Sequence, residues 1–428
     1  MANENLESKR WWIAIAAVIM QLCLGTVYAW SVFKKPLMGT HGWAETNTQL
    51  TFIIFMFVIG ISAAFGGTLV DKKGPRFVAT VGGILFGIGT LLSAVADQMG
   101  NIYILYLGYG LIGGIGNGFC YVTPIATLIR WFPDKRGLVT GLAVMGFGFG
   151  AFFMGQIAPK MIIAYKGGLT ASGVAMTFYI WGIIFLLLVV AAAQLFKNPP
   201  QGWLPAGFKP SATTVSAADS CNFDVACKTP QWWMLWSMLF LNVSAGLGLI
   251  SQLSPMAQDL FRPLADASLS PEDLVKALAV AGGSVVAYSA IFNGLGRLFW
   301  ARISDTIGRK SVFAIMFASQ AVIYALVAMN VINGYYLFLV AACYLLACYG
   351  GGFATMPAFC ADSFGPGYIG KCYGFMLTAW ACAGIAGPLV FAQLSRSMAL
   401  YIAAGLLVVG FFIALAYQRP DLKKVKVK

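Results

Sequence analysis

The residue best suited to chemistry in this sequence is Arg297, a permanent cation inside a long apolar stretch, residues 279–303. A charged side chain at the middle of a bilayer costs roughly 2.5 to 3.5 kcal/mol and usually marks a ligand site or a pathway. Arg297 lies eight positions before Asp305, which falls in the turn after the stretch, so a helix places it about 12 Å inside the membrane. A guanidinium at that depth suits a carboxylate, whose two oxygens match its planar fork.

The ordinary role of a buried arginine is a structural salt bridge, but the sequence offers Arg297 no partner at its depth. The 15 acidic residues fall in loops, in the chain ends or at the ends of apolar stretches, as Asp97 does. The missing counter-ion is therefore predicted to be an anionic substrate. The alternatives are a structural bond to backbone carbonyls or a misplaced helix. Asn293, one turn earlier, is expected to bond the anion, to orient Arg297 or to join a neighbouring helix.

Aromatic side chains reach a similar depth from other apolar stretches. Counted from the charged residue near the end of each stretch, Tyr121, Phe353 and Trp380 all lie about 13 Å inward. They are expected to wall the site, with the tyrosine hydroxyl as a donor and the rings against a short alkyl chain. Ordinary packing explains such residues nearly as well. Tyr28 and Tyr349 are weaker candidates for the same wall.

Twelve apolar stretches must position these residues, because each is long enough to cross a hydrocarbon core of roughly 30 Å as a helix. Backbone groups cannot stay unpaired in lipid and the alternation of a barrel is absent, so an all-α membrane protein is predicted. The expected spans are 11–33, 48–70, 77–97, 103–129, 138–163, 173–196, 231–253, 279–303, 311–331, 336–360, 372–394 and 398–417.

A short charged motif follows the second and the eighth span, 234 positions apart. Its glycine permits a tight turn, and its carboxylate can cap a helix or pair with a facing cation. A single copy could be an ordinary basic loop, but two copies at one spacing indicate duplicated six-helix halves with a ligand between them. The residues predicted to control the conformation are Asp71, Gly74 and Arg76 in one copy and Asp305, Gly308 and Arg309 in the other.

The composition and the distribution of charge predict how the chain lies in the membrane. Hydrophobic residues make up 59% of the chain and charged residues only 10%, which is too little polar surface for a water-soluble fold. With both termini in the cytoplasm, 20 of the 28 Lys and Arg residues lie inside, seven lie outside, and Arg297 remains. The net charge of +13 therefore predicts contact with anionic lipid and excludes nucleic acid as an expected partner.

The longest hydrophilic stretch divides the spans six and six. We expect an N-terminal half at 1–196, a cytoplasmic central loop rich in Pro and Ser at 197–230, and a C-terminal half with a short basic tail at 231–428. The nine cysteines are expected to be small apolar residues rather than a disulfide framework. The lone His41 falls in an outer loop, so no metal site and no cofactor are predicted.

The two charged motifs resemble those of the major facilitator superfamily, and the resemblance spans the whole chain. Three further segments are similar to the monocarboxylate transporters and the related oxalate/formate antiporters: residues 130–137, Asn293 with Arg297, and Tyr373-Gly374-Phe375. The resemblance implies a transporter in the cytoplasmic membrane of a prokaryote, functional as a monomer. It also implies that Tyr121, Asn293, Arg297 and Tyr349 line the substrate cavity.

Trp380 bears on the substrate that the resemblance implies. In the oxalate-exchanging relatives a lysine is expected at this place, which gives two cations for a dicarboxylate. One cation suits one carboxylate, so a small monocarboxylate such as lactate or pyruvate is predicted over oxalate. An organic-anion exchanger of the oxalate/formate kind is the alternative.

The mode of coupling stays open at this stage. Proton symport is the usual mode in the family, but no buried carboxylate or histidine presents itself as a proton carrier. Exchange and uniport therefore remain alternatives. An enzyme would need clustered nucleophiles, bases or metal ligands, and a receptor would need a signalling module, so neither is predicted.

Overall fold

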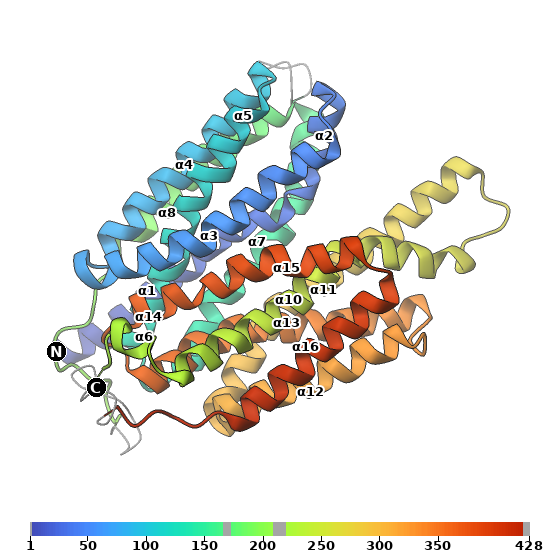
Figure 1. The fold of residues 1–428 in the computed structure, drawn as a ribbon. Coiled ribbons are helices and arrows are strands. Elements are labelled where there is room, and N and C mark those ends of the chain that lie inside the picture. Colours follow the sequence, from blue (N-terminus) through green and yellow to red (C-terminus); the bar gives the residue numbers. More distant parts are fainter. Residues whose placement is uncertain (1, 166–172, 209–219, 423–428) are drawn as a thin grey trace.

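The computed structural model describes residues 2–165, 173–208 and 220–422, and its regular elements there are helices (Figure 1). Each of the twelve predicted stretches lies on one helix or on consecutive helical segments, so the all-α prediction is confirmed. The first six stretches correspond to α1 (Ala2–Gly25), η1 (Thr26–Ala29) and α2 (Ser31–His41); α3 (Glu45–Lys73); α4 (Pro75–Met99); α5 (Ile102–Leu105), η2 (Tyr106–Gly113) and α6 (Gly114–Trp131); α7 (Arg136–Ala164); and α8 (Gly173–Gln194).

The other six stretches follow a short helix in the central loop, α9 (Phe223–Ala226). The seventh and eighth helices are longer than predicted, and a 3₁₀ turn, η3 (Arg262–Leu264), lies between them. The elements are α10 (Pro230–Phe261), α11 (Pro271–Ile307), α12 (Arg309–Ala328), α13 (Tyr335–Phe364), α14 (Ile369–Met376) with α15 (Thr378–Gln393), and α16 (Arg396–Ala416).

Eleven helical stretches of the described residues are long and apolar enough to span a membrane. Of the twelve predicted spans, the one that does not meet this criterion is on α11, although this helix is 37 residues long. Arg297, Asn293 and a run of Gly and Ser residues make its described part more polar than the other spans. The polar character of α11 therefore comes from the residues that the sequence marks as candidates for binding.

Three spans are broken rather than continuous. The first passes through the 3₁₀ turn η1, where the Thr26 hydroxyl donates to the Cys23 carbonyl at 2.7 Å. The fourth contains a π-helical segment, η2, a form found often near functional sites. The eleventh ends and restarts at Leu377, three residues before Trp380. The sequence analysis predicted none of these breaks.

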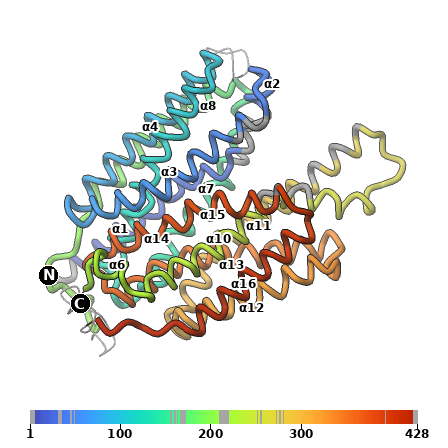
Figure 2. The backbone as a smooth tube through the Cα atoms, in the orientation of Figure 1, coloured from blue at the N-terminus to red at the C-terminus, as the bar shows by residue number. Residues whose placement is uncertain are grey.

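The helices form two bundles, α1 to α8 in blue to green and α10 to α16 in yellow-green to red (Figure 1). The backbone tube shows that the bundles meet near the end that carries both termini and diverge toward the other end (Figure 2). Helix α3 contacts α14 and α15, and α7 contacts α11 and α13, so these helices join the bundles. Both termini lie at the same end, as an even number of spans requires.

The two motif glycines make the tight turns expected of them. Gly74 joins α3 to α4 with a φ of 83°, and Gly308 joins α11 to α12 with a φ of 89°. Side chains with a Cβ rarely adopt this conformation, which explains why both turns use glycine. Each motif carboxylate thus lies two residues before the end of a long helix, close to the end of the molecule that carries the termini.

Candidate functional site

Arg297 lies where α11 of one bundle crosses α7 of the other, and only 1% of the residue is exposed. Two glycines permit this close crossing. A Cβ on Gly148 of α7 would lie 3.7 Å from Arg297 Nε, and a Cβ on Gly350 of α13 would lie 2.9 Å from Arg297 Cγ. The Arg297 side chain is therefore enclosed by glycine backbone on two sides.

Among the described residues, two acceptors meet the guanidinium in hydrogen-bond geometry, and both are neutral. Nε donates to Asn293 Oδ1 at 3.2 Å, and Nη1 donates to the Val144 carbonyl oxygen at 3.3 Å. No acidic side chain among residues 2–165, 173–208 and 220–422 forms an ion pair with Arg297. Bonding to a backbone carbonyl, an alternative to substrate binding, therefore accounts for one nitrogen but leaves the charge without a counter-ion. The cation keeps the capacity to bind an anion.

Two phenylalanine rings face the guanidinium. Its central carbon lies 5.7 Å from the ring centre of Phe147 on α7 and 5.6 Å from that of Phe353 on α13. A cation over aromatic faces gains about 0.5 to 2 kcal/mol and loses little of its ability to accept an anion at its edge. The rings thus hold the cation without neutralising it.

The predicted aromatic wall is assembled around these rings. Tyr121 of α6 and Trp380 of α15 lie 5.4 Å apart between ring centres, and Trp380 lies 5.1 Å from Phe353. The hydroxyls of Tyr28 and Tyr349 are 3.4 Å apart and link η1 to α13 across the two bundles. The structure therefore brings all seven of the predicted binding residues into one region.

The sequence analysis missed three members of this group. Phe147 and Val144 belong to an apolar, glycine-rich part of α7 with no chemical signal of its own. Tyr373 entered only as part of a family motif, yet it is fully buried and lies close to Tyr121 and Arg297. The position of a tyrosine at the start of the eleventh span was the only available signal.

Gly350 offers a test of the close crossing. A Cβ there would lie 2.3 Å from the Asn293 carbonyl oxygen, so α11 must shift and carry Arg297 with it. Such overpacking costs about 1 to 3 kcal/mol. We expect Gly350→Ala to lower substrate uptake by roughly tenfold or more. Gly405→Ala in α16, where a Cβ meets no atom within 4 Å, should leave uptake at the parent rate. Equal loss in both variants would show that Gly350 has no special role.

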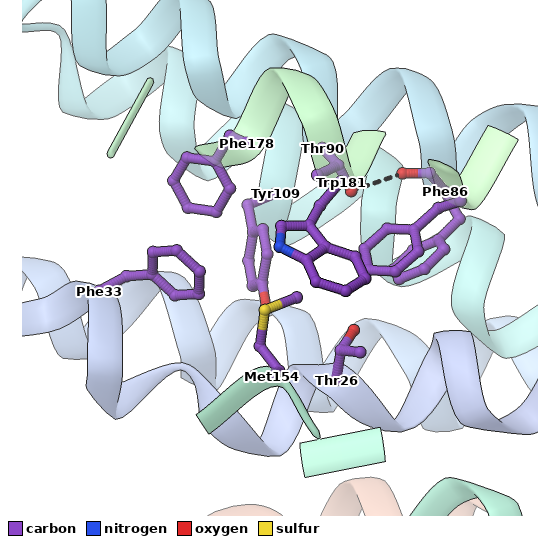
Figure 3. A pocket seen from close by; sticks show the side chains of 9 residues that line it. Thr26, Phe33, Phe86, Thr90, Tyr109, Met154, Phe178 and Trp181 are labelled. Carbon is purple, nitrogen blue, oxygen red and sulfur yellow. Dashed lines mark hydrogen bonds between the residues drawn. The ribbon is translucent and has the colours of Figure 1, made fainter. Parts of the chain in front are cut away.

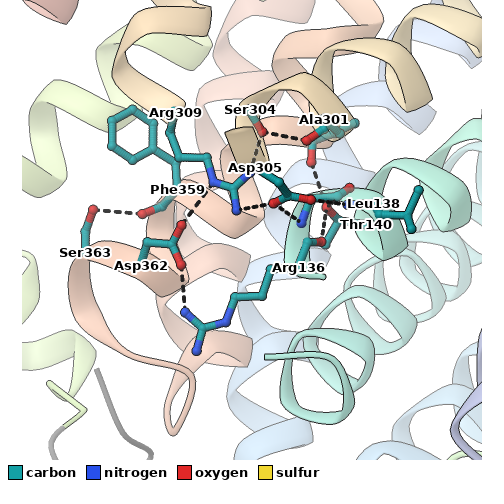
Figure 4. A network of polar contacts seen from close by, with 12 residues as sticks. Arg136, Leu138, Thr140, Ala301, Ser304, Asp305, Arg309, Phe359, Asp362 and Ser363 are labelled. Carbon is teal, nitrogen blue, oxygen red and sulfur yellow. Dashed lines mark hydrogen bonds and ion pairs between the residues drawn. The ribbon is translucent and has the colours of Figure 1, made fainter. Parts of the chain in front are cut away.

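A polar network joins the bundles near the end that carries the termini (Figure 4). Asp305 at the end of α11 accepts hydrogen bonds from the backbone N–H groups of Gly137 at 3.0 Å and Leu138 at 2.9 Å. These N–H groups open α7, so the carboxylate caps a helix of the other bundle, where its charge suits the helix dipole. Arg309 pairs with the same carboxylate at 2.6 Å.

Asp362 of α13 extends this network. Its carboxylate oxygens pair with Arg136 at 2.6 Å and with Arg309 at 3.0 Å, and Figure 4 shows the two guanidiniums on either side of it. Because Arg136 begins α7, this pair also crosses between the bundles. Asp362 is thus a second carboxylate that holds the start of α7.

Asp71 forms the related contact in the other copy of the motif. It accepts from the backbone N–H of Lys371 at 2.7 Å, at the start of α14, and pairs with Arg130 at 2.5 Å. Lys371 follows Gly137 by 234 positions, the same spacing that separates the two aspartates. Each motif carboxylate therefore caps the equivalent helix of the opposite bundle. Arg76 lies elsewhere and donates to the Gln194 carbonyl within its own bundle.

These contacts define which end of the molecule is closed. Among the described residues, the side-chain hydrogen bonds and ion pairs between the bundles lie from the level of Arg297 to the end with the termini. At the other end, His41 pairs with buried Asp97 at 2.7 Å, but both belong to one bundle. The structure is a state that is closed at the end carrying the termini.

The last residues of the central loop reinforce this closed end. Phe223 of α9 stacks on Phe375 with ring centres 4.3 Å apart. The Lys371 ammonium donates to Asp224 at 2.7 Å and holds the pKa of that exposed carboxyl below its usual range. The loop is therefore fastened to the start of α14, next to the contact made by Asp71.

An enclosed pocket inside the first bundle is distinct from this region (Figure 3). Figure 3 shows Tyr109 of η2 and Trp181 of α8 facing Met154 of α7, with further aromatic and threonine side chains around them. The lining contains no charged residue, and the cavity of about 10 Å³ has room for about one water molecule. It is too small for a three-carbon acid, so the region of Arg297 remains the candidate for binding.

Comparison with known proteins agrees with the resemblance that the two charged motifs predict. The model of the Major Facilitator Superfamily matches residues 13–269 and 267–428. The chain is 28% identical to the oxalate:formate antiporter of Oxalobacter formigenes over 434 residues, 99% of this chain and 96% of that protein. It is 24% identical to Apicoplast pyruvate carrier 1 of Toxoplasma gondii, with 92% and 85% covered.

A solved structure supports the fold. The fucose:proton symporter of Escherichia coli aligns with a TM-score of 0.68 and 16% identity, over 94% of this chain and 98% of that one. At this identity the likeness concerns the fold alone. The resemblance expected from the repeated motifs, including the likeness to an oxalate/formate antiporter, is confirmed.

Proposed function

Since this chain belongs to the Major Facilitator Superfamily and is an integral membrane transporter rather than an enzyme, we propose that it carries small monocarboxylates of the lactate and pyruvate type. Transport proceeds by alternating access, with Arg297 as the group that binds the carboxylate. The substrate anion neutralises the buried cation and allows the bundles to close around it. The proposed binding residues are Arg297, Asn293, Tyr121, Tyr349, Trp380, Phe353 and Tyr28.

One observation carries the proposal: a fully buried guanidinium with two neutral acceptors and no described acidic partner. Burying an uncompensated cation is costly, and a transporter recovers that cost when its anion binds. A single cation favours a single carboxylate. Phe147 and Phe353 supply apolar rings next to the cation, and Trp380 packs against Phe353, a setting that suits a chain of one or two carbons.

The alternative is an exchanger of oxalate and formate. The similarity to the antiporter of Oxalobacter formigenes over nearly the whole chain favours it. Trp380, whose ring packs on Phe353 next to the cation, argues for the monocarboxylate instead, because a dicarboxylate would place its second charge among aromatic rings. Counterflow against external oxalate separates the two proposals.

The proposed cycle assigns a role to the charged motifs. Asp71 and Asp305 stabilise the state closed at the end with the termini, and their release opens that end. With the termini in the cytoplasm, as the basic residues predict, this is the outward-facing or occluded part of the cycle. A prokaryotic cytoplasmic membrane with anionic lipid is the proposed location, and a monomer is the proposed working unit.

Uptake of labelled lactate by proteoliposomes tests the function and its coupling. We expect saturable uptake that is inhibited by excess pyruvate and barely by oxalate. An imposed inward proton gradient should raise the initial rate several-fold if transport is proton symport. Uptake that is insensitive to the gradient would contradict symport, and exchange of oxalate for formate without lactate uptake would replace this proposal by the alternative.

A further inference from the structure

Three buried hydrogen-bond donors in the region of Arg297 have no acceptor among the described residues. The Tyr121 hydroxyl, the Tyr373 hydroxyl and the Trp380 indole N–H make no hydrogen bond with any part of the chain that the structure describes. The exposed fractions of the three residues are 1%, 0% and 1%. A buried polar group without a partner is destabilising, so three at one place require a reason.

These donors converge from both bundles. Tyr121 is on α6, whereas Tyr373 and Trp380 are on α14 and α15, on either side of the break at Leu377. The rings of Tyr121 and Trp380 are neighbours, with ring centres 5.4 Å apart. The hydroxyls of Tyr121 and Tyr373 lie near each other and near the charge of Arg297, but they do not meet in hydrogen-bond geometry.

The break in the eleventh span positions two of the donors. The backbone N–H of Trp380 donates to the Leu377 carbonyl at 3.0 Å, in a turn that restarts the helix. Gln21 Nε2 donates to the Tyr121 carbonyl at 3.2 Å and fixes that part of α6 from α1. The donors are therefore held by the backbone, whereas their polar atoms are left available.

We propose that Tyr373, with Tyr121 and Trp380, forms a neutral donor cluster that binds the oxygen on the second carbon of the substrate. This inference rests on the proposed function, because it assumes that Arg297 binds the carboxylate of the same molecule. A 2-oxo acid presents an acceptor next to its carboxylate, and a 2-hydroxy acid can accept or donate. An unsubstituted acid such as propionate leaves all three donors unpaired.

The cluster thus makes Tyr373 a specificity-determining residue. A site built to bond a substrate oxygen discriminates strongly against the analogue that lacks it, because buried donors then stay unsatisfied. If charge attraction to Arg297 were the only interaction, pyruvate and propionate would bind with about equal affinity. The chain is therefore expected to prefer pyruvate and lactate over propionate by at least tenfold.

The test measures competition of pyruvate, lactate and propionate against labelled pyruvate in proteoliposomes, for the parent, Tyr373→Phe and Trp380→Phe. We expect each variant to reduce the ratio of pyruvate to propionate affinity by about three- to tenfold, the effect of one neutral hydrogen bond. Tyr324→Phe is the matched control, because its buried hydroxyl bonds the Ala245 carbonyl within one bundle. Its affinity ratio should equal that of the parent.

The outcomes distinguish a failure of the donor cluster from a failure of the proposed function. A parent that binds pyruvate and propionate equally, or a Tyr373→Phe ratio equal to that of the parent, overturns the donor cluster but leaves the carboxylate carrier intact. A parent that takes up none of the three acids overturns the proposed function itself. If a variant fails to fold, the other variant still decides the question, because Tyr373 and Trp380 contribute separate donors.

Discussion

Replacing Arg297 by lysine is expected to reduce lactate uptake by roughly 10- to 100-fold, although the positive charge is kept. Lysine loses the planar fork that can hold both carboxylate oxygens, and it cannot reproduce the bonds to Asn293 and Val144 together. Charged hydrogen bonds of this kind contribute about 1.5 to 3 kcal/mol each. The measurement is the initial rate of uptake as a function of substrate concentration, normalised to the protein in the liposomes.

Arg302→Lys is the matched control for this substitution. Arg302 is on the same helix but is exposed near its end, so the change should leave the uptake rate close to that of the parent. Normal transport by Arg297→Lys would mean that the guanidinium is structural, held by its backbone carbonyl and the two rings. The binding role would then have to move to other residues.

Asp305→Asn is expected to open the end of the molecule that carries the termini. The asparagine loses the negative charge that pairs with Arg309 and caps α7. A loss of about 1 to 3 kcal/mol from the closed state shifts the equilibrium by roughly 5- to 150-fold. Spin labels at Lys73→Cys and Thr306→Cys, in a background without native cysteines, would report a longer distance distribution.

Asp259→Asn provides the comparison for the spin-label experiment. Asp259 also pairs with an arginine, Arg396, but both belong to the second bundle and lie away from the junction. Its distance distribution should match that of the parent. If Asp305→Asn gives the parent distribution as well, the carboxylate does not hold the bundles together, and the gating role fails.

Much of the fold could be predicted from the sequence because lipid restricts the choices. Apolar stretches of about 20 residues must be helices, and the two copies of the motif reveal the repeat. The breaks at η1, η2 and Leu377 could not be predicted. They depend on close packing between helices, which no local pattern in these stretches records.

The candidate site was only partly predictable for a related reason. Arg297 is conspicuous because a charge in lipid is costly, and helical rise places Tyr121 and Trp380 at its depth. Val144 and Phe147 have no such signal and become neighbours only through the crossing of α7 and α11. The capping of α7 by Asp305 likewise joins residues more than 160 positions apart.

Calorimetric titration of the purified chain with pyruvate and with its uncharged amide tests the central claim most directly. The two ligands share size and the 2-oxo oxygen and differ in the charge that Arg297 is proposed to bind. We predict that pyruvate binds and that the amide binds at least tenfold more weakly, the loss of one charged hydrogen bond or more. Equal affinity for the two ligands, or no binding of pyruvate, would contradict a carrier built around one buried cation.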